Sequence, residues 1–325
     1  MNYNKKIKST LCKIKNLALH VMDEDKNTLK NAFDIAFDND TFALYKYSSA
    51  LQEKYKAILL STFSELSGSL AFLAIQILAA NAIMNKNNFA RKERFFKKKC
   101  GIAINHLHLK TTQVQGRKVK NGYLLTGTLT WASGYTIFDS LLIGFHYKEY
   151  ELEVLSSFKN RKGFIISPAC DTFVGYSINT VNIELKDFFV KDKNIVSSHN
   201  LGNYSKNRSL AKSIHYCIYG LGKAAIKESN NISFKTESKL LLKKKQESVI
   251  ACTDAKELSI LRVELFLFVQ ELITTAMVLN GGKSIFTHSS FQRYYREIIM
   301  FNSNGLNQNL KDIFLLKYKN ESCPL

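Results

Sequence analysis

The hydrophobic period of the sequence changes twice, and this feature restricts the possible folds more than any other. Up to about Lys99, apolar residues recur at steps of three and four, as they do along amphipathic helices. From Gly101 onward, short runs rich in β-branched and aromatic residues follow one another, and polar turns such as Lys120-Asn121-Gly122 separate them. The helical pattern returns at about Leu210. Helices and strands segregated in this way predict an α+β fold rather than an alternating, doubly wound one.

These changes predict three domains: a helical domain over residues 1–100, an antiparallel sheet or barrel over 101–195, and a second helical domain over 196–325. A chain of 325 residues is too long for a single small module. Its 2 prolines and 15 glycines are too few for the many tight turns of an all-β sandwich. Strands are expected at 102–104, 123–131, 140–145, 151–158, 163–167 and 177–185.

The longest helical pattern runs from Ile58 to Met84 and contains Gly68, which permits either a close helix contact or a break into two helices. Within it, the apolar stretch from Leu70 onward is too short to span a membrane, and Gln76 and Asn81 interrupt it. We therefore expect a buried core helix there and no membrane span.

One segment lacks a clear period. The residues from Glu228 to Ser248 are rich in Asn, Ser and Lys, which predicts a long loop. The part from Ser238 to Ser248 could instead extend as a basic helix.

The chain carries 46 Lys+Arg against 27 Asp+Glu, a formal net charge of +19 at pH 7. Such a surplus suggests an anionic partner. It lies at both ends of the chain, however, consists mostly of lysine, and comes without a nucleic-acid-binding motif. Helix faces made basic by composition are the simpler interpretation, and recruitment of an anionic ligand or of nucleic acid is the alternative.

The cysteine pattern and the N-terminus bear on the compartment. The six cysteines stand far apart, without a C-x-x-C pair, which indicates free thiols in a reducing compartment. Met1 to Lys8 is basic but is not followed by the apolar run of a secretory signal. We expect a cytoplasmic protein.

Taken alone, no local motif assigns a chemistry. His106 and His108 form an H-x-H pair on an expected strand, where both imidazoles would share one face, but a third metal ligand is not in view. Gly220 and Gly222 belong to no dinucleotide-binding or phosphate-binding loop. Ser133 lies in W-A-S-G, which is not the nucleophile elbow of a hydrolase.

The run NGYLLTGTLTWASG (Asn121–Gly134), read in order with segments before and after it, resembles the acyl-CoA dehydrogenase superfamily. This run resembles the G-Y-x-L-x-G-x-x-x-W-[small or branched]-[ST] pattern of its middle β-domain. Upstream, Glu65–Gln76 followed by Gly101–Leu107 looks like the buried helix and the first flavin-contacting strand. Downstream, Gly281-Gly282 and Arg293–Glu297 (RYYRE) match the double glycine after a long helix and the R-x-x-R-[DE] pattern. The resemblance covers most of the chain.

The resemblance implies an N-terminal helical domain, a central antiparallel β-barrel and a C-terminal four-helix bundle. It also implies FAD held between barrel and bundle and completed by a second subunit. The flavin contacts that it implies are Trp131, Ala132 and Ser133 at the ring edge near N5 and O4, the backbone of Ile102, Ala103, Ile104 and Asn105 at the pyrimidine side, and Gly281 and Gly282 near the partner subunit's cofactor.

The residue types suit these roles. A flat aromatic side chain such as Trp131 can pack against the flavin ring, and the hydroxyl of Ser133 can tune the ring, while the flavin carries the redox chemistry. The alternative is structural: Trp131 would be barrel core and Ser133 a turn residue.

The sequence departs from the superfamily where its catalytic base is expected. Dehydrogenases of this superfamily need a carboxylate to remove the substrate's α-proton. The position in one branch corresponds to Gly305, or to Asn304 with one gap, and in the other branch to Lys212, none of which is a carboxylate. The superfamily's R-x-x-F-G motif, expected near Ser238 to Leu241, is absent, and Val278 replaces the glutamine before the double glycine.

The leading prediction is a divergent, FAD-dependent oxidoreductase that acts on an acyl thioester such as acyl-CoA, or on a related apolar substrate. It would oxidise CH–CH groups or act as a monooxygenase-like relative, and its catalytic residues are not assigned. A split cofactor site requires a homodimer or homotetramer. Two alternatives remain: a catalytically degenerate relative that serves in binding or assembly, and a basic helical interaction protein.

Overall fold

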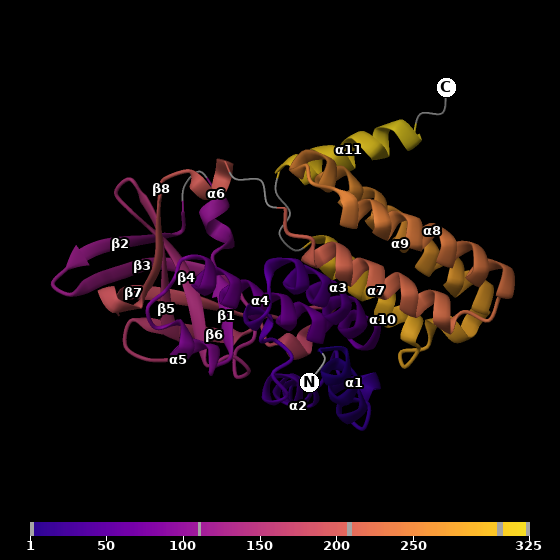
Figure 1. The fold of residues 1–325 in the computed structure, drawn as a ribbon, viewed down its shortest axis with the longest axis horizontal. Helices are drawn as coiled ribbons and strands as arrows, with labels where there is room; N and C mark the ends of the chain where they lie inside the picture. The colour runs from indigo at the N-terminus through magenta and orange to yellow at the C-terminus, as the bar shows by residue number, and fades with distance from the viewer. Residues whose placement is uncertain (1–2, 110–111, 207–209, 304–307, 323–325) are drawn as a thin grey trace. The chain divides into compact units, whose positions relative to one another are not determined.

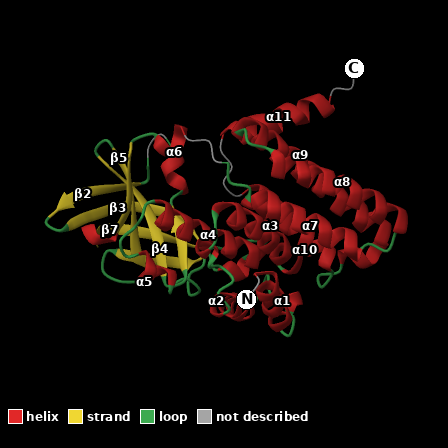
Figure 2. Ribbon diagram, in the orientation of Figure 1, coloured by secondary structure: helices red, strands yellow, loops and turns green. Residues whose placement is uncertain are grey.

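The computed structural model describes residues 3–109, 112–206, 210–303 and 308–322, and the chain divides into two compact units (Figure 1). Unit 1 comprises Met1–Gln52, Phe72–Thr172 and Tyr176–Asn207; unit 2 comprises Glu53–Ala71, Phe173–Gly175 and Arg208–Leu325. The strands gather in one sheet, with helices before and after them in the chain (Figure 2). The α+β class is therefore confirmed, and the division into three domains stays a prediction.

The first helices of unit 1 are α1 (Tyr3–Ile14) and α2 (Lys26–Asp38), followed by the short 3-10 helix η2 (Leu44–Lys46). Helix α2 begins where Asp25 accepts a hydrogen bond from the Thr28 backbone N–H at 2.6 Å, which is an N-cap contact. The Thr28 hydrogen bonds lower the pKa of Asp25. The buried Phe33 of α2 stacks on Phe42, with ring centroids 4.9 Å apart.

The long helical pattern breaks at Gly68. Helix α3 (Ser49–Leu66) ends before it, and helix α4 (Gly68–Lys86) begins with it. Leu73, Ala74 and Ile77 of α4 are fully buried, so the predicted core helix is confirmed. Helix α5 (Lys92–Phe96) follows α4 and leads into the sheet.

Two described segments are long and apolar enough to cross a membrane by length and composition, Gly68–Lys86 and Ala255–Ile285. Of the apolar window, 72% is buried in the first and 39% in the second. Core helices of soluble proteins have the same properties, so the expectation of no membrane span stays a prediction.

The sheet has eight strands in the order β6-β7-β3-β2-β4-β5-β8, and β1 pairs with β4. The strands are β1 (Cys100–Ala103), β2 (Val114–Val119), β3 (Gly122–Ala132), β4 (Ser140–Tyr147), β5 (Tyr150–Ser157), β6 (Phe164–Ala169), β7 (Val181–Lys191) and β8 (Ile195–Asn200). All six predicted strands are present in part or in full. The sequence did not predict β2 and β8, which are short and carry few apolar residues.

The predicted closed antiparallel barrel is wrong. The sheet is open, because its path ends at β6 and β8, which do not pair with each other in the described residues. Strand β1 pairs in parallel with Ser140–Ile143 on β4, which leaves β2 a single pairing with that strand, Gln115 with His146. At the other end, β6 contains Pro168, which cannot donate a ladder hydrogen bond.

A core cluster of unit 1 joins residues of α4, α5 and four strands. Its members are Ala80, Met84, Phe89, Phe95, Phe96, Cys100, Ile104, Leu107, Leu142, Leu155 and Val196. The cluster fixes the N-terminal helices to the part of the sheet where β1 lies.

Unit 2 is built from α7 (Ser213–Glu228), α8 (Ile232–Ala251), α9 (Ala255–Asn280) and α10 (Ser290–Ser303), which pack on one another, while α11 (Gln308–Ser322) packs on α9. A Cβ added at Gly220 would lie 2.2 Å from the Ser61 carbonyl oxygen, so this glycine permits the close approach of α7 to α3.

The loop predicted over residues 228–248 is wrong for most of its length, because α8 is a helix there. Asn231 caps it by accepting a hydrogen bond from the Phe234 N–H at 2.9 Å. Leu242, Gln246 and Val249 are buried at helical spacing, so tertiary packing stabilises a polar sequence as a helix.

Candidate functional site

Trp131 is presented outward by an irregularity near the end of β3. Its side chain is 66% exposed, which excludes the interpretation of this residue as sheet core. The pairing of β3 with β7 shifts register between Leu129 and Ala132, so Trp131 lies in a β-bulge, a feature that re-aims side chains next to functional sites. Its φ of +58° is a backbone conformation that bulky residues rarely adopt. The bulge is held by Asn182, whose Oδ1 accepts the Trp131 N–H at 3.2 Å.

The next two residues turn inward. Ala132 is fully buried and pairs with Val181 on β7. Ser133 is 6% exposed, and its hydroxyl shares a hydrogen bond with the Thr180 hydroxyl at 3.0 Å. The hydroxyl predicted to meet the flavin is thus already engaged within the sheet, and its predicted contact stays a prediction.

The segment predicted to line the flavin's pyrimidine side lies on β1 and just beyond it. Ile102 and Ala103 are half-buried, Ile104 is buried and Asn105 is exposed. The Ile102 N–H donates to Oε1 of Gln76 on α4 at 3.2 Å. The Ile104 carbonyl accepts a hydrogen bond within the following turn. The Ile102 N–H and the Ile104 carbonyl are therefore occupied by the protein itself, and Ile102 and Ala103 also take part in the pairing of β1 with β4.

His106 and His108 lie on the 3-10 helix η3 (Asn105–His108), so the predicted strand is wrong at this point. His106 Nε2 is bonded to the Gly144 carbonyl at 2.9 Å, and His108 Nδ1 to the Tyr204 carbonyl at 2.8 Å. Burial lowers the pKa of His106. Each imidazole anchors η3 to a different neighbour, and the two do not face a shared position.

In unit 2, Gly281 and Gly282 follow α9 and begin the 3-10 helix η6 (Gly281–Ile285). Gly281 is the C-cap residue of α9 and has φ +66° and ψ −158°, a backbone conformation that L side chains rarely adopt and glycine adopts readily. Apart from the adjoining residues, no heavy atom of the described part of the chain lies within 4 Å of a Cβ added at either position, so both glycines face open space there. Exposed apolar side chains flank them: Val278 is 79% and Ile285 74% exposed.

Glu297, the carboxylate of the R-x-x-R-[DE] match, is engaged by other groups of the protein. Glu297 is fully buried and receives two hydrogen bonds from the Arg293 Nη1, at 2.9 and 3.0 Å. The Gly68 N–H, at the start of α4, donates to Glu297 Oε1 at 2.7 Å. A Cβ at Gly68 would lie 2.7 Å from the Glu297 Cδ, so any residue larger than glycine would clash with Glu297 at this position. Glu297 therefore caps α4 and pairs with Arg293, and it has no free oxygen for catalysis.

The positions at which the superfamily would place its base supply no carboxylate. Lys212 precedes α7 and its Nζ donates to the Ile250 carbonyl at 2.7 Å. Asn304 and Gly305 lie outside the described residues.

A buried acidic cluster of unit 1 was not predicted from the sequence. Glu151 and Glu153 lie on β5 and are each 1% exposed. Glu151 accepts hydrogen bonds from the backbone N–H groups of Gly202, at 2.8 Å, and Tyr204, at 3.0 Å. Glu153 accepts from the Ser197 and Tyr204 hydroxyls. The sequence signal that could have revealed the cluster is Glu151 and Glu153, which stand two positions apart on β5 and therefore lie on the same face of the strand.

His146 is the titratable neighbour of this cluster. Its Nε2 lies 3.7 Å from the Glu151 Oε1, and burial lowers the pKa of His146 although Glu151 acts in the opposite direction. Burial and Glu153 raise the pKa of the Tyr204 hydroxyl, which stays protonated and donates. The cluster fastens the helix α6 (Asn203–Lys206) to β5, and its oxygens are satisfied within the protein.

Comparison with known proteins supports the resemblance at the level of fold. No protein family model matches the sequence, and no curated protein sequence matches it. Glutaryl-coenzyme A dehydrogenase in complex with glutaryl-CoA superposes with a TM-score of 0.76, at 12% identity over 98% of this chain and 95% of the other. Butyryl-CoA dehydrogenase from Megasphaera elsdenii gives 0.75, at 12% identity over 98% of each chain. XiaF from Streptomyces sp., in complex with FADH2 and glycerol, gives 0.68, at 14% identity over 89% of this chain and 88% of the other.

Proposed function

The chain has the fold of the acyl-CoA dehydrogenase superfamily, and from this premise we propose that it is a flavin-dependent oxidoreductase. The observation that carries the proposal is Trp131, an exposed aromatic side chain held in a left-handed backbone conformation by a β-bulge. Strain of this kind persists only where the surroundings enforce it, and it is concentrated at binding sites.

The described residues fit a flavin in part. The exposed face of Trp131 supplies a flat apolar surface, and Ala103 and Asn105 carry backbone groups in the segment that would line the pyrimidine side. The Ser133 hydroxyl would have to share its bond with Thr180 in order to reach the ring. When bound, the flavin supplies hydride and electron transfer, while the protein binds and orients both cofactor and substrate.

The missing carboxylate determines which chemistry we propose. The position of the bundle base is Lys212, whose ammonium group is bonded to a carbonyl, and Glu297 is bound to Arg293. We therefore propose redox chemistry that does not begin with removal of an α-proton by a glutamate. The proposed substrate is an acyl thioester such as acyl-CoA, or a related apolar molecule. The net charge of +19 favours the phosphates of a CoA carrier.

We also propose that the active species is a homodimer. Gly281 and Gly282 would face the partner subunit's cofactor, and the exposed Val278, Leu279, Ile285 and Phe286 around them would be covered by the partner. Light scattering at micromolar concentration is expected to give twice the chain mass. A strictly monomeric species would exclude a site completed by a second subunit.

The visible absorption spectrum of the purified protein, recorded before and after FAD addition and gel filtration, tests the cofactor. Retained flavin bands at about one flavin per chain are expected. A colourless protein that takes up no FAD would overturn the proposal and favour a degenerate relative that serves in binding.

A further inference from the structure

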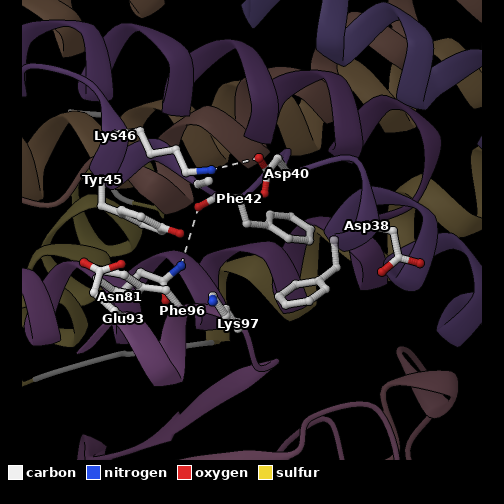
Figure 3. Close-up of a pocket in the computed structure, with 11 residues that line it drawn as sticks. Asp38, Asp40, Phe42, Tyr45, Lys46, Asn81, Glu93, Phe96 and Lys97 are labelled. Carbon is white, nitrogen blue, oxygen red and sulfur yellow. Dashed lines mark hydrogen bonds and ion pairs between the residues drawn. The ribbon is translucent and has the colours of Figure 1, made fainter. Parts of the chain in front are cut away.

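Unit 1 contains a hollow that its helical part forms, remote in sequence from the Trp131 segment. Its volume is about 440 Å³, within the range of small-molecule sites. Figure 3 shows the side chains that line it. Its walls come from the end of α2, from η2, and from α4 and α5. The residues of these elements that line the hollow have no role in the proposed flavin chemistry.

Aromatic side chains form the apolar wall. Tyr45 and Phe96 stack with ring centroids 3.8 Å apart and an angle of 15° between their planes. Phe42 is 3% exposed and lies beside them in the lining. Burial raises the pKa of the Tyr45 hydroxyl, so this group is a neutral donor and acceptor at the hollow.

One buried polar atom in the lining lacks a hydrogen-bond donor. Asn81, on α4, is 6% exposed, and its Nδ2 donates to the Phe42 carbonyl at 3.5 Å. No described residue donates a hydrogen bond to its Oδ1. Exchange of the two amide atoms would place oxygen against the carbonyl oxygen of Phe42, so the observed orientation is the favourable one. A buried acceptor without a donor is destabilising, and a ligand that donates to it would remove that penalty.

The charges favour a cation. Asp40 is bonded to Lys46 at 2.8 Å, which leaves Asp38 and Glu93 against Lys97 in the lining. The lining thus carries three carboxylates, Asp38, Asp40 and Glu93, against two ammonium groups, Lys46 and Lys97, although the whole chain carries +19. Figure 3 shows the Tyr45 hydroxyl directed toward the Asn81 amide.

We infer that this hollow binds a small protonated primary amine with an aromatic or similarly apolar body. The ammonium group donates to the Asn81 Oδ1 and is paired with the Glu93 carboxylate. The body packs against Tyr45 and Phe96, whose ring faces also attract a cation. Access of the ammonium group to Oδ1 requires a small shift of the Asn81 side chain, because this atom is buried.

Isothermal titration of the full chain, without added flavin, tests this inference. Three probes share the same phenyl body and differ in their polar group: 2-phenylethylamine, 2-phenylethanol and phenylacetate. Saturable binding of the amine alone is expected. Asn81→Leu and Glu93→Gln should each weaken it about tenfold, the loss of one hydrogen bond or ion pair to a charged group. Glu149→Gln, in the exposed turn between β4 and β5, is the matched control and should leave the affinity unchanged.

Three results would overturn the inference: no saturable binding of the amine, equal binding of the alcohol or the carboxylate, or amine binding that survives in both variants. Asn81→Leu removes a buried unsatisfied oxygen together with the long hydrogen bond to the Phe42 carbonyl, and that carbonyl keeps its bond from the Leu44 N–H, so the thermal midpoint should stay close to that of the native chain. Glu93→Gln is a surface change that keeps the fold in any case. Because no flavin is used, failure of this test leaves the proposed function standing.

Discussion

Trp131 in the sheet and Glu297 in the bundle both match motifs of the same superfamily, but the structure treats them in opposite ways. Trp131 is 66% exposed and held in a rare backbone conformation, whereas Glu297 is fully buried and bonded to Arg293 and Gly68. An exposed, strained residue contributes little to the folded state and is available for a ligand. A buried, fully bonded residue stabilises the fold. The burial and the hydrogen bonds of a motif residue therefore indicate whether it is available to contact a ligand or stabilises the fold.

The largest effect is expected at Glu297. Glu297→Ala removes the carboxylate that accepts from the Arg293 Nη1 and from the Gly68 N–H, and breaking this buried ion pair costs about 3–5 kcal/mol of unfolding free energy. Glu297→Gln keeps the shape and one acceptor, and should lose less. Urea unfolding followed by circular dichroism measures both. If Glu297→Ala were as stable as the native chain, Glu297 would have to be assigned a role other than structural.

The next effect is a pH dependence that His215 gives to the stability of the bundle. His215 of α7 is buried, its Nε2 is bonded to the Leu258 carbonyl, and no described residue is bonded to its Nδ1. Burial lowers the pKa of His215 from 6.5 to about 4. Because the folded state prefers the neutral ring, stability is complete above pH 6.5 and falls as the pH drops toward 4, by roughly 3 kcal/mol for this group.

The loss of unfolding free energy at low pH should be smaller in His215→Gln, which carries no titrating ring. Urea unfolding at pH 7 and pH 4.5 compares the two chains, and circular dichroism follows the helices. Trp131 is the single tryptophan, so its fluorescence reports on the sheet separately. An identical acid loss in the native chain and the variant would contradict the assignment to His215.

A substitution at Trp131 with a smaller expected effect tests whether this residue serves ligand binding at the expense of protein stability. Trp131→Gly places at φ +58° the residue that adopts this conformation without strain, so we expect about 1 kcal/mol of added stability. The same change removes the aromatic surface and should weaken FAD retention by about tenfold or more. Trp131→Phe is the matched variant and should retain most of the binding. Unchanged FAD retention in Trp131→Gly would remove the proposed contact.

The smallest effect is expected at Ser133. Ser133→Ala removes the hydrogen bond to Thr180 and should lower the unfolding free energy by about 1 kcal/mol. Because this hydroxyl is engaged within the sheet, FAD retention should change by less than about twofold, under 0.5 kcal/mol. A large loss of FAD in this variant would show that the hydroxyl turns toward the ring.

The sequence predicted the elements whose period is clear and missed those that tertiary contacts decide. Strand β3 follows from local pattern, and the break at Gly68 is one of the two outcomes that the sequence left open. Helix η3 does not follow from local pattern, because His106 and His108 take their conformation from carbonyls far along the chain. Helix α8 was expected only as an alternative from Ser238 to Ser248, because its polar composition hides a narrow buried stripe, and the structure confirms that alternative.

The candidate site, too, was predictable from the sequence only in part. The motif identified Trp131, but no sequence pattern indicates its bulge or its positive φ, since both depend on the pairing with β7. The hollow at Asn81 was not predictable, because residues from α2, η2, α4 and α5 meet there only after folding.

We propose that the chain binds a flavin but lacks the carboxylate for α,β-dehydrogenation. Anaerobic titration of the FAD-loaded protein with butyryl-CoA, and then with dithionite, examines both properties in one experiment. We expect the flavin bands to persist with butyryl-CoA and to bleach with dithionite. Rapid bleaching by butyryl-CoA, or a protein that holds no flavin to bleach, would contradict the proposal.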